Sequence, residues 1–162
     1  MRCLVVLAHP LPDSLNARFA RHVVKALQDL GHEVRFADLY AERFDPVLSA
    51  EERQSYYQDA FDDQAGLRDV EMLVLVFPTW WFGLPAILKG WIDRSFLPGV
   101  AYDHASDLKA LTPKLTGMKR VLAITTLGSP AWIDRLILRR PVKQALKWGL
   151  VKACAPQARF QM

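Results

Sequence analysis

The chain has 162 residues, of which 51% are hydrophobic and 23% charged, a balance typical of one folded domain and not of a disordered chain. Its net charge of +4 is mildly basic, but the cations form no dense stripe with interleaved aromatic residues, so nucleic-acid binding is not favoured. The histidines lack the spacing of metal ligands, and we predict no metal site. The two cysteines lie far apart, and the amino-terminal apolar run is too short for a signal peptide, which indicates a cytoplasmic protein.

The first predicted elements are a buried strand over residues 3–7 and a helix that follows a polar loop. The apolar positions of the helix, among them Phe19, Val23 and Leu27, recur on one face. The first backbone N–H groups of a helix lack partners and lie at the positive end of its dipole, so the loop suits an anion, most often a phosphate. An ordinary capped helix after a strand explains the same residues equally well.

Polar side chains that suit such an anion lie in this loop. Asp13 or Ser14 can cap the helix, and the hydroxyl of Ser14 and the amide of Asn16 can donate to phosphate oxygens. His9 leaves the end of the strand and adds a further donor. The sequence therefore offers a candidate phosphate loop directly after its first strand.

The next stretch predicts an edge strand and a short surface helix. Residues 33–39 alternate between polar and apolar, which is typical of a strand with one exposed face. Strand, helix and strand then form a βαβ unit. In the polar excursion 40–67, Ser49 and Glu52 have the spacing of a capping box, so we expect a helix to begin there.

An apolar run over residues 70–77 predicts a central parallel strand that is covered on both faces. It leads into three consecutive aromatic residues, Trp80, Trp81 and Phe82, before a helix whose first turn contains Pro85. Such a loop at the carboxyl end of a strand offers a planar ligand a flat wall and free backbone N–H groups. An aromatic plug or a subunit interface is the alternative, and the position of the loop favours the ligand site.

The loop of residues 97–117 is long, and long loops in compact domains are often functional. Its Tyr102 and His104 are candidate polar groups near a substrate. Plain loop residues are the alternative, and from the sequence alone that alternative is slightly favoured.

The last part of the chain predicts a strand over residues 120–126, a tight turn that contains Gly128, and helical stretches over 132–138 and 142–152 with a break at the intervening proline. A final strand is expected over residues 157–161. The helical part carries a cluster of cations, namely Arg135, Arg139, Arg140, Lys143 and Lys147. A solvated helix face is the favoured interpretation, and attraction of a phosphorylated cofactor or an acidic partner is the alternative.

Alternating strands and helices without a linker or repeat predict a single α/β doubly wound domain over residues 1–162. In such folds ligands bind beyond the carboxyl ends of the strands. The loops of residues 9–16, 78–83 and 125–130 all fall there and supply phosphate donors, an aromatic wall, and threonine hydroxyls with a glycine. The dinucleotide-binding and P-loop glycine motifs are both absent, so the candidate phosphate loop belongs to neither of those classes. A phosphate loop after the first strand with an aromatic wall after the third is the arrangement of flavin binding in a flavodoxin-like fold.

At two motifs the chain resembles the flavodoxin-like NAD(P)H:quinone oxidoreductases, and the resemblance covers about residues 3–130. The motifs are Ala8-His9-Pro10-x-x-x-Ser14-x-Asn16 and the more specific Phe77-Pro78-x-Trp80-Trp81-Phe82-Gly83-Leu84-Pro85-Ala86-x-Leu88-Lys89-Gly90-Trp91-Ile92-Asp93-Arg94. The resemblance implies a five-stranded parallel sheet of order 2-1-3-4-5 with helices on both faces. It also implies FMN or FAD, a homodimer, and ping-pong hydride transfer from NAD(P)H through flavin N5 to a quinone.

The same resemblance assigns roles to individual residues. It implies that Tyr102 faces the substrate from the partner subunit, and we predict Tyr102 and His104 as the catalytic residues. The predicted cofactor-binding residues are His9, Ser14, Leu15, Asn16, Pro78, Thr79, Trp80, Trp81, Phe82, Thr125, Thr126 and Gly128.

Two departures from the family pattern stand out. Leu127 replaces the first of two glycines, and no Tyr or His follows His104, so a side-chain proton relay from that loop is not expected. The helix with which family members usually end is not expected within this sequence. An azo- or nitroreductase of the same fold and a regulatory flavoprotein of a potassium-efflux system, which would have a membrane partner, remain alternatives. An electron-carrier flavodoxin fits this basic chain poorly, and a flavin-free relative is the last alternative.

Overall fold

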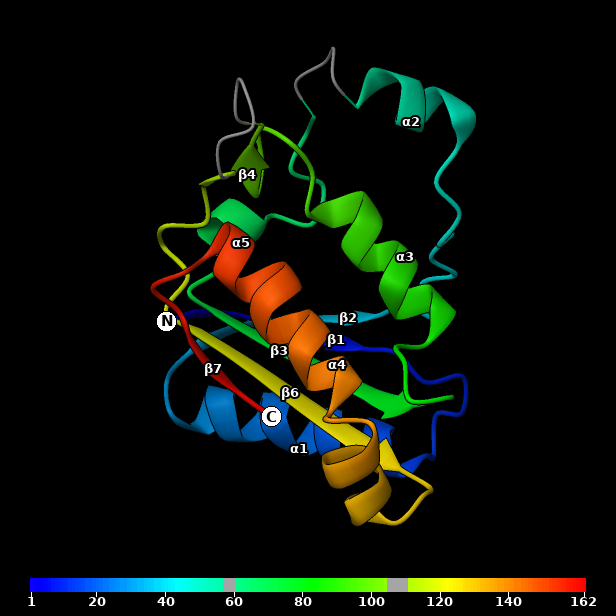
Figure 1. The fold of residues 1–162 in the computed structure, drawn as a ribbon. Coiled ribbons are helices and arrows are strands. Elements are labelled where there is room, and N and C mark those ends of the chain that lie inside the picture. Colours follow the sequence, from blue (N-terminus) through cyan, green and yellow to red (C-terminus); the bar gives the residue numbers. More distant parts are fainter. Residues whose placement is uncertain (57–60, 105–110) are drawn as a thin grey trace.

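The computed structural model describes residues 1–56, 61–104 and 111–162. Its centre is a five-stranded parallel sheet with the strand order β2-β1-β3-β6-β7 (Figure 1). This order is the predicted 2-1-3-4-5, counted along the strands of this sheet, so the doubly wound α/β prediction is confirmed. The strands are β1 (Arg2–Leu7), β2 (Glu33–Asp38), β3 (Met72–Thr79), β6 (Arg120–Leu127) and β7 (Arg159–Gln161).

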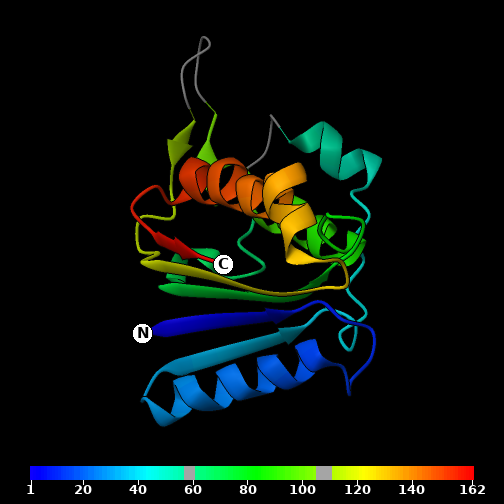
Figure 2. The ribbon, with the colours of Figure 1, turned by 60° about the horizontal axis from the view of Figure 1, so that its bottom comes forward.

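Helices cover both faces of the sheet, as Figure 2 shows. One face is covered by α1 (Leu15–Asp29). The other is covered by α3 (Ala86–Ser95) and by a continuous helical stretch that runs from α4 (Pro141–Gln144) through the π-helical segment Ala145–Val151 to α5 (Lys152–Cys154).

The remaining elements are short. They are α2 (Ala50–Ser55), a 3₁₀ turn (Leu67–Asp69), a π-helical turn (Ile133–Ile137), and the antiparallel pair of β4 (Tyr102–Asp103) and β5 (Thr112–Pro113).

The apolar runs of the central strands are explained by burial on both faces. In β1 and β3, Val5 and Val74 pack under α1, whereas Leu4 and Leu73 pack under the helices of the opposite face. All four side chains are buried, because successive side chains of a strand point to opposite faces and both faces are covered here. The edge strand β2 remains partly exposed, which agrees with its alternating sequence.

Strand order places a crevice at one edge of this sheet. From β1 the chain moves through α1 to β2 on one side, and β3 then lies on the other side of β1. The loops after β1 and β3 therefore leave adjacent strands in opposite directions, which is the arrangement that opens a ligand crevice beyond the carboxyl ends. The site described below lies at this edge.

Local sequence signals set several helix boundaries. Ser49 and Glu52 form the predicted capping box at the start of α2. Pro85 was expected in the first turn of α3, because its fixed φ angle suits that position. It is instead the N-cap residue, so the helix begins one residue later, at Ala86. The expected break near residue 140 is confirmed, because Arg140 adopts a left-handed φ of 56° and Pro141 then begins α4.

Candidate functional site

The aromatic loop after β3 is a tight two-residue turn. The N–H of Gly83 donates to the carbonyl of Trp80 at 2.8 Å, and the N–H of Trp80 donates back at 3.2 Å. Trp81 and Phe82 at its tip both have positive φ angles, 50° and 55°. Non-glycine residues rarely adopt this conformation, and such strain is concentrated at ligand-binding sites. The side chain of Trp81 is 99% exposed, so it contributes nothing to the core that would account for the strain.

A cavity of about 570 Å³ lies between this turn and the turn after β6. Its volume is within the range of small-molecule sites, and one wall is aromatic. The residues that line it are Pro78, Thr79, Trp80, Trp81, Phe82, Thr126, Leu127, Gly128 and Ser129. Two of the three predicted loops are thus joined around one space.

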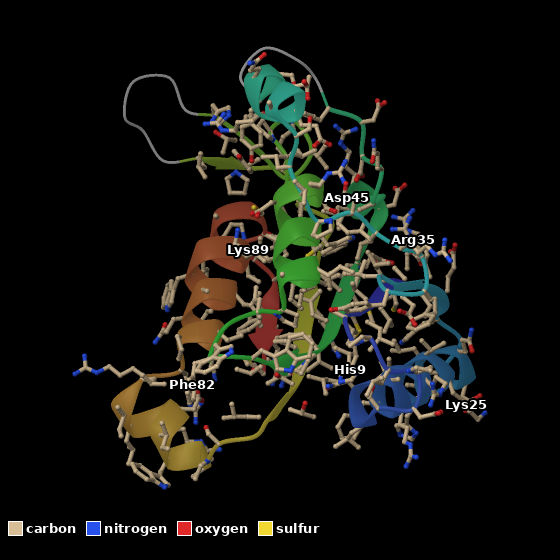
Figure 3. All side chains as sticks on the ribbon, turned by 90° about the vertical axis from the view of Figure 1, so that its right-hand side faces the viewer. His9, Lys25, Arg35, Asp45, Phe82 and Lys89 are labelled. Atoms are coloured by element: carbon tan, nitrogen blue, oxygen red, sulfur yellow. The ribbon has the colours of Figure 1, made fainter. Side chains whose placement is uncertain are left out.

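The third predicted loop lies beside this cavity. Ser14 caps α1, because its hydroxyl oxygen accepts from the N–H of Ala17 at 3.1 Å, and its own O–H stays available as a donor. The ring of His9 is 6.2 Å from that of Trp80, centroid to centroid, so the two loops adjoin. The Nδ1 atom of His9 accepts from the N–H of Leu11 at 3.0 Å. Figure 3 shows His9 and Phe82 at the same end of the molecule.

Asn16 connects this loop to the end of β6. Its side-chain amide donates to the hydroxyl of Thr126 at 3.0 Å, and Thr126 lines the cavity. The Asn16 side chain is buried, and its Oδ1 atom has no hydrogen-bond partner among the described residues. A buried polar atom without a partner is costly, which is a reason to expect a donor that the protein itself does not supply. The phosphate-side loop and the cavity are therefore parts of one site.

Thr125 lies behind the main cavity. Its hydroxyl is 2.7 Å from that of Thr79, and both residues line a second, smaller cavity of about 190 Å³. Three cations from the following segment, Arg135, Arg140 and Lys143, line this second cavity. The two cavities share Thr79 and Leu127 in their walls, so the basic segment adjoins the aromatic site.

The structure does not bring Tyr102 and His104 to this site within one chain. α3 runs back across the sheet, so β4 lies at the opposite end from the aromatic turn (Figure 1). There the hydroxyls of Tyr56 and Tyr102 are 3.0 Å apart, and the ring of His104 packs edge-on against Tyr102 at 5.5 Å. Their predicted role therefore requires a second copy of the chain.

One predicted site residue, Leu15, remains to be placed, and two residues that line the cavity were not predicted. Leu15 begins α1 and is 54% exposed. Leu127 and Ser129 line the main cavity although neither was predicted as a site residue. Their only signal in the sequence is that they flank Gly128 in a tight turn, and only the pairing of β6 with β3 shows that this turn faces the aromatic one.

Among the residues described, no group of three or more His, Cys, Asp or Glu side chains is arranged to hold a metal ion. Within the same ranges no helix combines the length and apolar character that crossing a membrane requires.

Comparison with known proteins identifies the family. The sequence model of the flavodoxin-like fold family matches residues 1–153. The chain belongs to this family. Among curated relatives, NAD(P)H dehydrogenase [quinone] 1 of Cavia porcellus is 37% identical over 152 residues, which cover 79% of this chain and 54% of that protein. The chain spans about half the length of the first curated relatives it matches.

Two solved structures show how widely the fold is shared. The Streptococcus mutans protein Smu.1420 superposes with a TM-score of 0.80 at 32% identity, covering 99% of this chain and 86% of that one. An FMN-dependent NADH-azoreductase of Bacillus anthracis, solved with FMN, superposes with a TM-score of 0.72, covering 99% of this chain and 85% of that one. At 16% identity the second likeness shows the fold alone.

Proposed function

We propose that this chain binds FMN or FAD at the carboxyl edge of its sheet and is a flavin-dependent oxidoreductase that uses NAD(P)H to reduce a quinone or a quinone-like acceptor. The observation that carries the proposal is the single cavity between the aromatic turn and the Thr126–Ser129 turn, beside the start of α1. Family membership and relatives named as quinone dehydrogenases support the same chemistry.

The residues present fit a flavin in three parts. Trp80, Trp81 and Phe82 offer the aromatic wall against which a planar ring packs. The start of α1, with Ser14 as its cap, offers a phosphate the unpaired N–H groups of a helix end. Asn16 lies between these two parts and has an unpartnered amide oxygen, which suits a hydroxyl donor of a bound ligand.

When bound, a flavin would supply the redox chemistry of hydride transfer between NAD(P)H and the acceptor. The protein supplies orientation and a polar environment. Thr126, Leu127 and Gly128 line the cavity, and backbone N–H groups of this stretch would stabilise negative charge on the ligand. Leu127, which stands where the family pattern has a glycine, lines this wall and adds no titratable group, so we propose no side-chain proton relay there.

The acceptor distinguishes this proposal from its nearest alternative. Structural neighbours with the same fold include azoreductases, so an azo or nitro compound is the second candidate acceptor. Trp81 lines the cavity and its side chain is almost completely exposed, so we expect this wall to accept more than one planar acceptor. Comparison of initial rates with quinones, azo dyes and nitroaromatics separates the two.

We further propose that the chain acts as a homodimer in the cytoplasm. Tyr102 and His104 can reach an aromatic cavity in a second copy of the chain, since within one chain β4 lies at the end of the five-stranded sheet opposite to the cavity. The cytoplasm is supported by Cys3 and Cys154, which are buried, free thiols.

The decisive experiment is the visible absorption spectrum of the purified protein with FMN or FAD added, before and after NAD(P)H under anaerobic conditions. We expect a bound flavin whose absorption bleaches with NAD(P)H and recovers when a quinone is added. A protein that retains no flavin would refute the proposal at its first step. A flavin that binds but is not bleached would refute the NAD(P)H part alone.

The substitution Trp81→Ala tests the placement of the ring. Because Trp81 is exposed, its removal should leave the unfolding temperature unchanged while weakening flavin retention by about tenfold, the loss expected from one aromatic contact. Trp148→Ala is the matched control, since that indole is also exposed, at 58%, but lies outside the cavity walls. Equal flavin occupancy in the two variants would place the ring elsewhere.

A further inference from the structure

The charge of this chain is divided unevenly along its length. Residues 1–134 carry 14 cationic and 17 acidic side chains, whereas residues 135–162 carry seven cationic side chains and no acidic one. The overall net charge of +4 conceals this division. The carboxyl-terminal part of the sequence is therefore strongly basic, whereas the part before it is slightly acidic.

Exposed apolar side chains lie close together in the sequence where this basic part begins. Within residues 132–143, which we term the basic apolar segment, Trp132, Leu136 and Ile137 are 55%, 76% and 60% exposed. Arg135 and Arg139 alternate with them in the sequence. Figure 1 shows that the π-helical turn of this segment projects from the end of the sheet where β6 ends.

None of the cations of this segment forms an ion pair among the described residues, although Asp134 lines the same small cavity as Arg135, Arg140 and Lys143. Elsewhere in the chain, exposed lysines such as Lys25 and Lys89 each pair with an aspartate. The segment thus combines unpaired positive charge with apolar side chains that the fold leaves in water. A solvated helix face, which the sequence favours, explains the cations but not the exposed Trp132, Leu136 and Ile137.

We propose that the basic apolar segment binds the surface of an anionic lipid membrane. Cations near such a surface are attracted by its negative potential, and Trp and Leu side chains gain free energy when they enter the boundary between headgroups and acyl chains. The segment projects as a short convex turn, which suits insertion into a soft interface. The proposal does not depend on the flavin, because it rests on charge and exposure alone.

A second copy of the chain and an acidic protein fit this segment less well. A contact between this segment and the same segment of a second copy would bring the cations of both copies together, with only Asp134 of each copy to offset them, so a second copy would have to meet it with a different surface. An acidic protein would satisfy the charges, but the anchoring side chains of protein interfaces pack into complementary pockets, and a short projecting turn suits a soft interface better.

The basic apolar segment adjoins the candidate site, so membrane binding by this segment would bring the lipid surface close to the site. Arg135, Arg140 and Lys143 line the small cavity that shares Thr79 and Leu127 with the aromatic cavity. A membrane bound by this segment therefore lies next to the cavity, where an apolar acceptor dissolved in the lipid has a short path to it.

Vesicle co-sedimentation tests the proposal, with Trp emission as a second measurement. Vesicles of phosphatidylcholine alone are compared with vesicles that also contain phosphatidylglycerol, with and without added flavin. We expect binding and a blue shift of Trp emission only with the anionic vesicles, in both flavin states, and a loss of binding as salt is raised.

Matched substitutions locate the contact. Leu136→Gln should weaken vesicle binding by about tenfold, because it removes one inserted side chain. Leu30→Gln, at a residue that is 72% exposed at the end of α1, should leave binding unchanged. Arg139→Gln should weaken binding roughly fivefold, and Lys25→Gln, the same charge change on α1, should not.

Four outcomes would overturn the proposal. They are the absence of binding to anionic vesicles, equal binding to both vesicle types, an equal effect of Leu136→Gln and Leu30→Gln, and a lipid-independent dimer that Leu136→Gln dissociates. Failure to bind flavin would leave all of these measurements interpretable, so this proposal and the proposed function can fail separately.

Discussion

The side-chain amide of Asn16 donates a hydrogen bond to the hydroxyl of Thr126 at 3.0 Å and so joins two elements through residues that are 110 positions apart in the chain. Asn16 lies in the first turn of α1, beside the candidate phosphate loop, and Thr126 lies in β6 at the wall of the aromatic cavity. A change at either end of this bond therefore reaches both parts of the site.

Asn16→Ala should weaken flavin binding by about tenfold or more, because it removes both the connection to Thr126 and the unpartnered acceptor atom. It should also lower the free energy of unfolding by about 1–2 kcal/mol, the usual cost of one buried hydrogen bond. Isothermal titration with FMN and chemical denaturation measure the two effects. Gln28→Ala, at an exposed residue of the same helix, is the control. Comparable flavin affinity in the two variants would contradict the role of Asn16.

Gly90 allows α3 to pack closely against the segment before α2. A Cβ atom at this position would lie 2.2 Å from the carbonyl oxygen of Pro46, so Gly90→Ala should destabilise the protein by about 1–3 kcal/mol through overpacking. Gly149→Ala makes the same change where no atom lies within 4 Å of the added carbon, and should stabilise the helix by about 0.5–1 kcal/mol. Denaturant midpoints of the two variants should move in opposite directions, and a shift in the same direction would contradict the packing at Gly90.

Glu71 holds the amino ends of three strands together. Its carboxylate accepts from the N–H of Arg2 at 2.9 Å and from the ammonium of Lys119, and its carbonyl accepts from the N–H of Lys119 at 2.7 Å. The side-chain bond to Lys119, followed by the bond from the Arg2 N–H, lowers the pKa of Glu71 from 4.5 to about 2.

A carboxyl group whose pKa is lower in the folded state stabilises the fold above its unfolded pKa, and this contribution is lost as the pH falls through its folded pKa. Glu71→Gln should therefore lower the unfolding temperature at neutral pH, and the difference from the wild type should shrink between about pH 4.5 and pH 2. Thermal melts across this range measure it, with Glu33→Gln on the exposed edge strand as the control for loss of one charge. A difference that does not change with pH would show that the Glu71 carboxylate makes no stabilising contact.

Cys154 should be unreactive in the native protein. Burial raises the pKa of its thiol from 9.0 to about 11, and the side chain is almost inaccessible. The thiolate is the reactive form, so at neutral pH its population, and with it the alkylation rate, should fall about a hundredfold below that of an ordinary thiol. Timed alkylation followed by mass spectrometry measures the rate at each cysteine, with the denatured protein as the reference. Native labelling as fast as denatured labelling would show that the packing around Cys154 opens readily.

Much of the fold was predictable because its signals are local. Uninterrupted apolar runs indicated β1 and β3 as buried strands, and candidate cap residues, Asp13 or Ser14 and then Ser49, marked the starts of two helices. Each signal depends on neighbours in the sequence, through side-chain periodicity or through a side chain that bonds to nearby backbone. Once the elements alternate, the doubly wound arrangement places their loops at a common edge.

The site could be predicted only in part, for a physical reason. Residue type and local order are enough to show which loops carry aromatic, hydroxyl and helix-start groups. The folded arrangement was needed to show that Asn16 bonds to Thr126, that Thr125 lines the second cavity with Thr79, and that α3 carries Tyr102 away to the opposite end. Such relationships join residues distant in the chain, and they depend on strand register and helix direction, which no local pattern encodes.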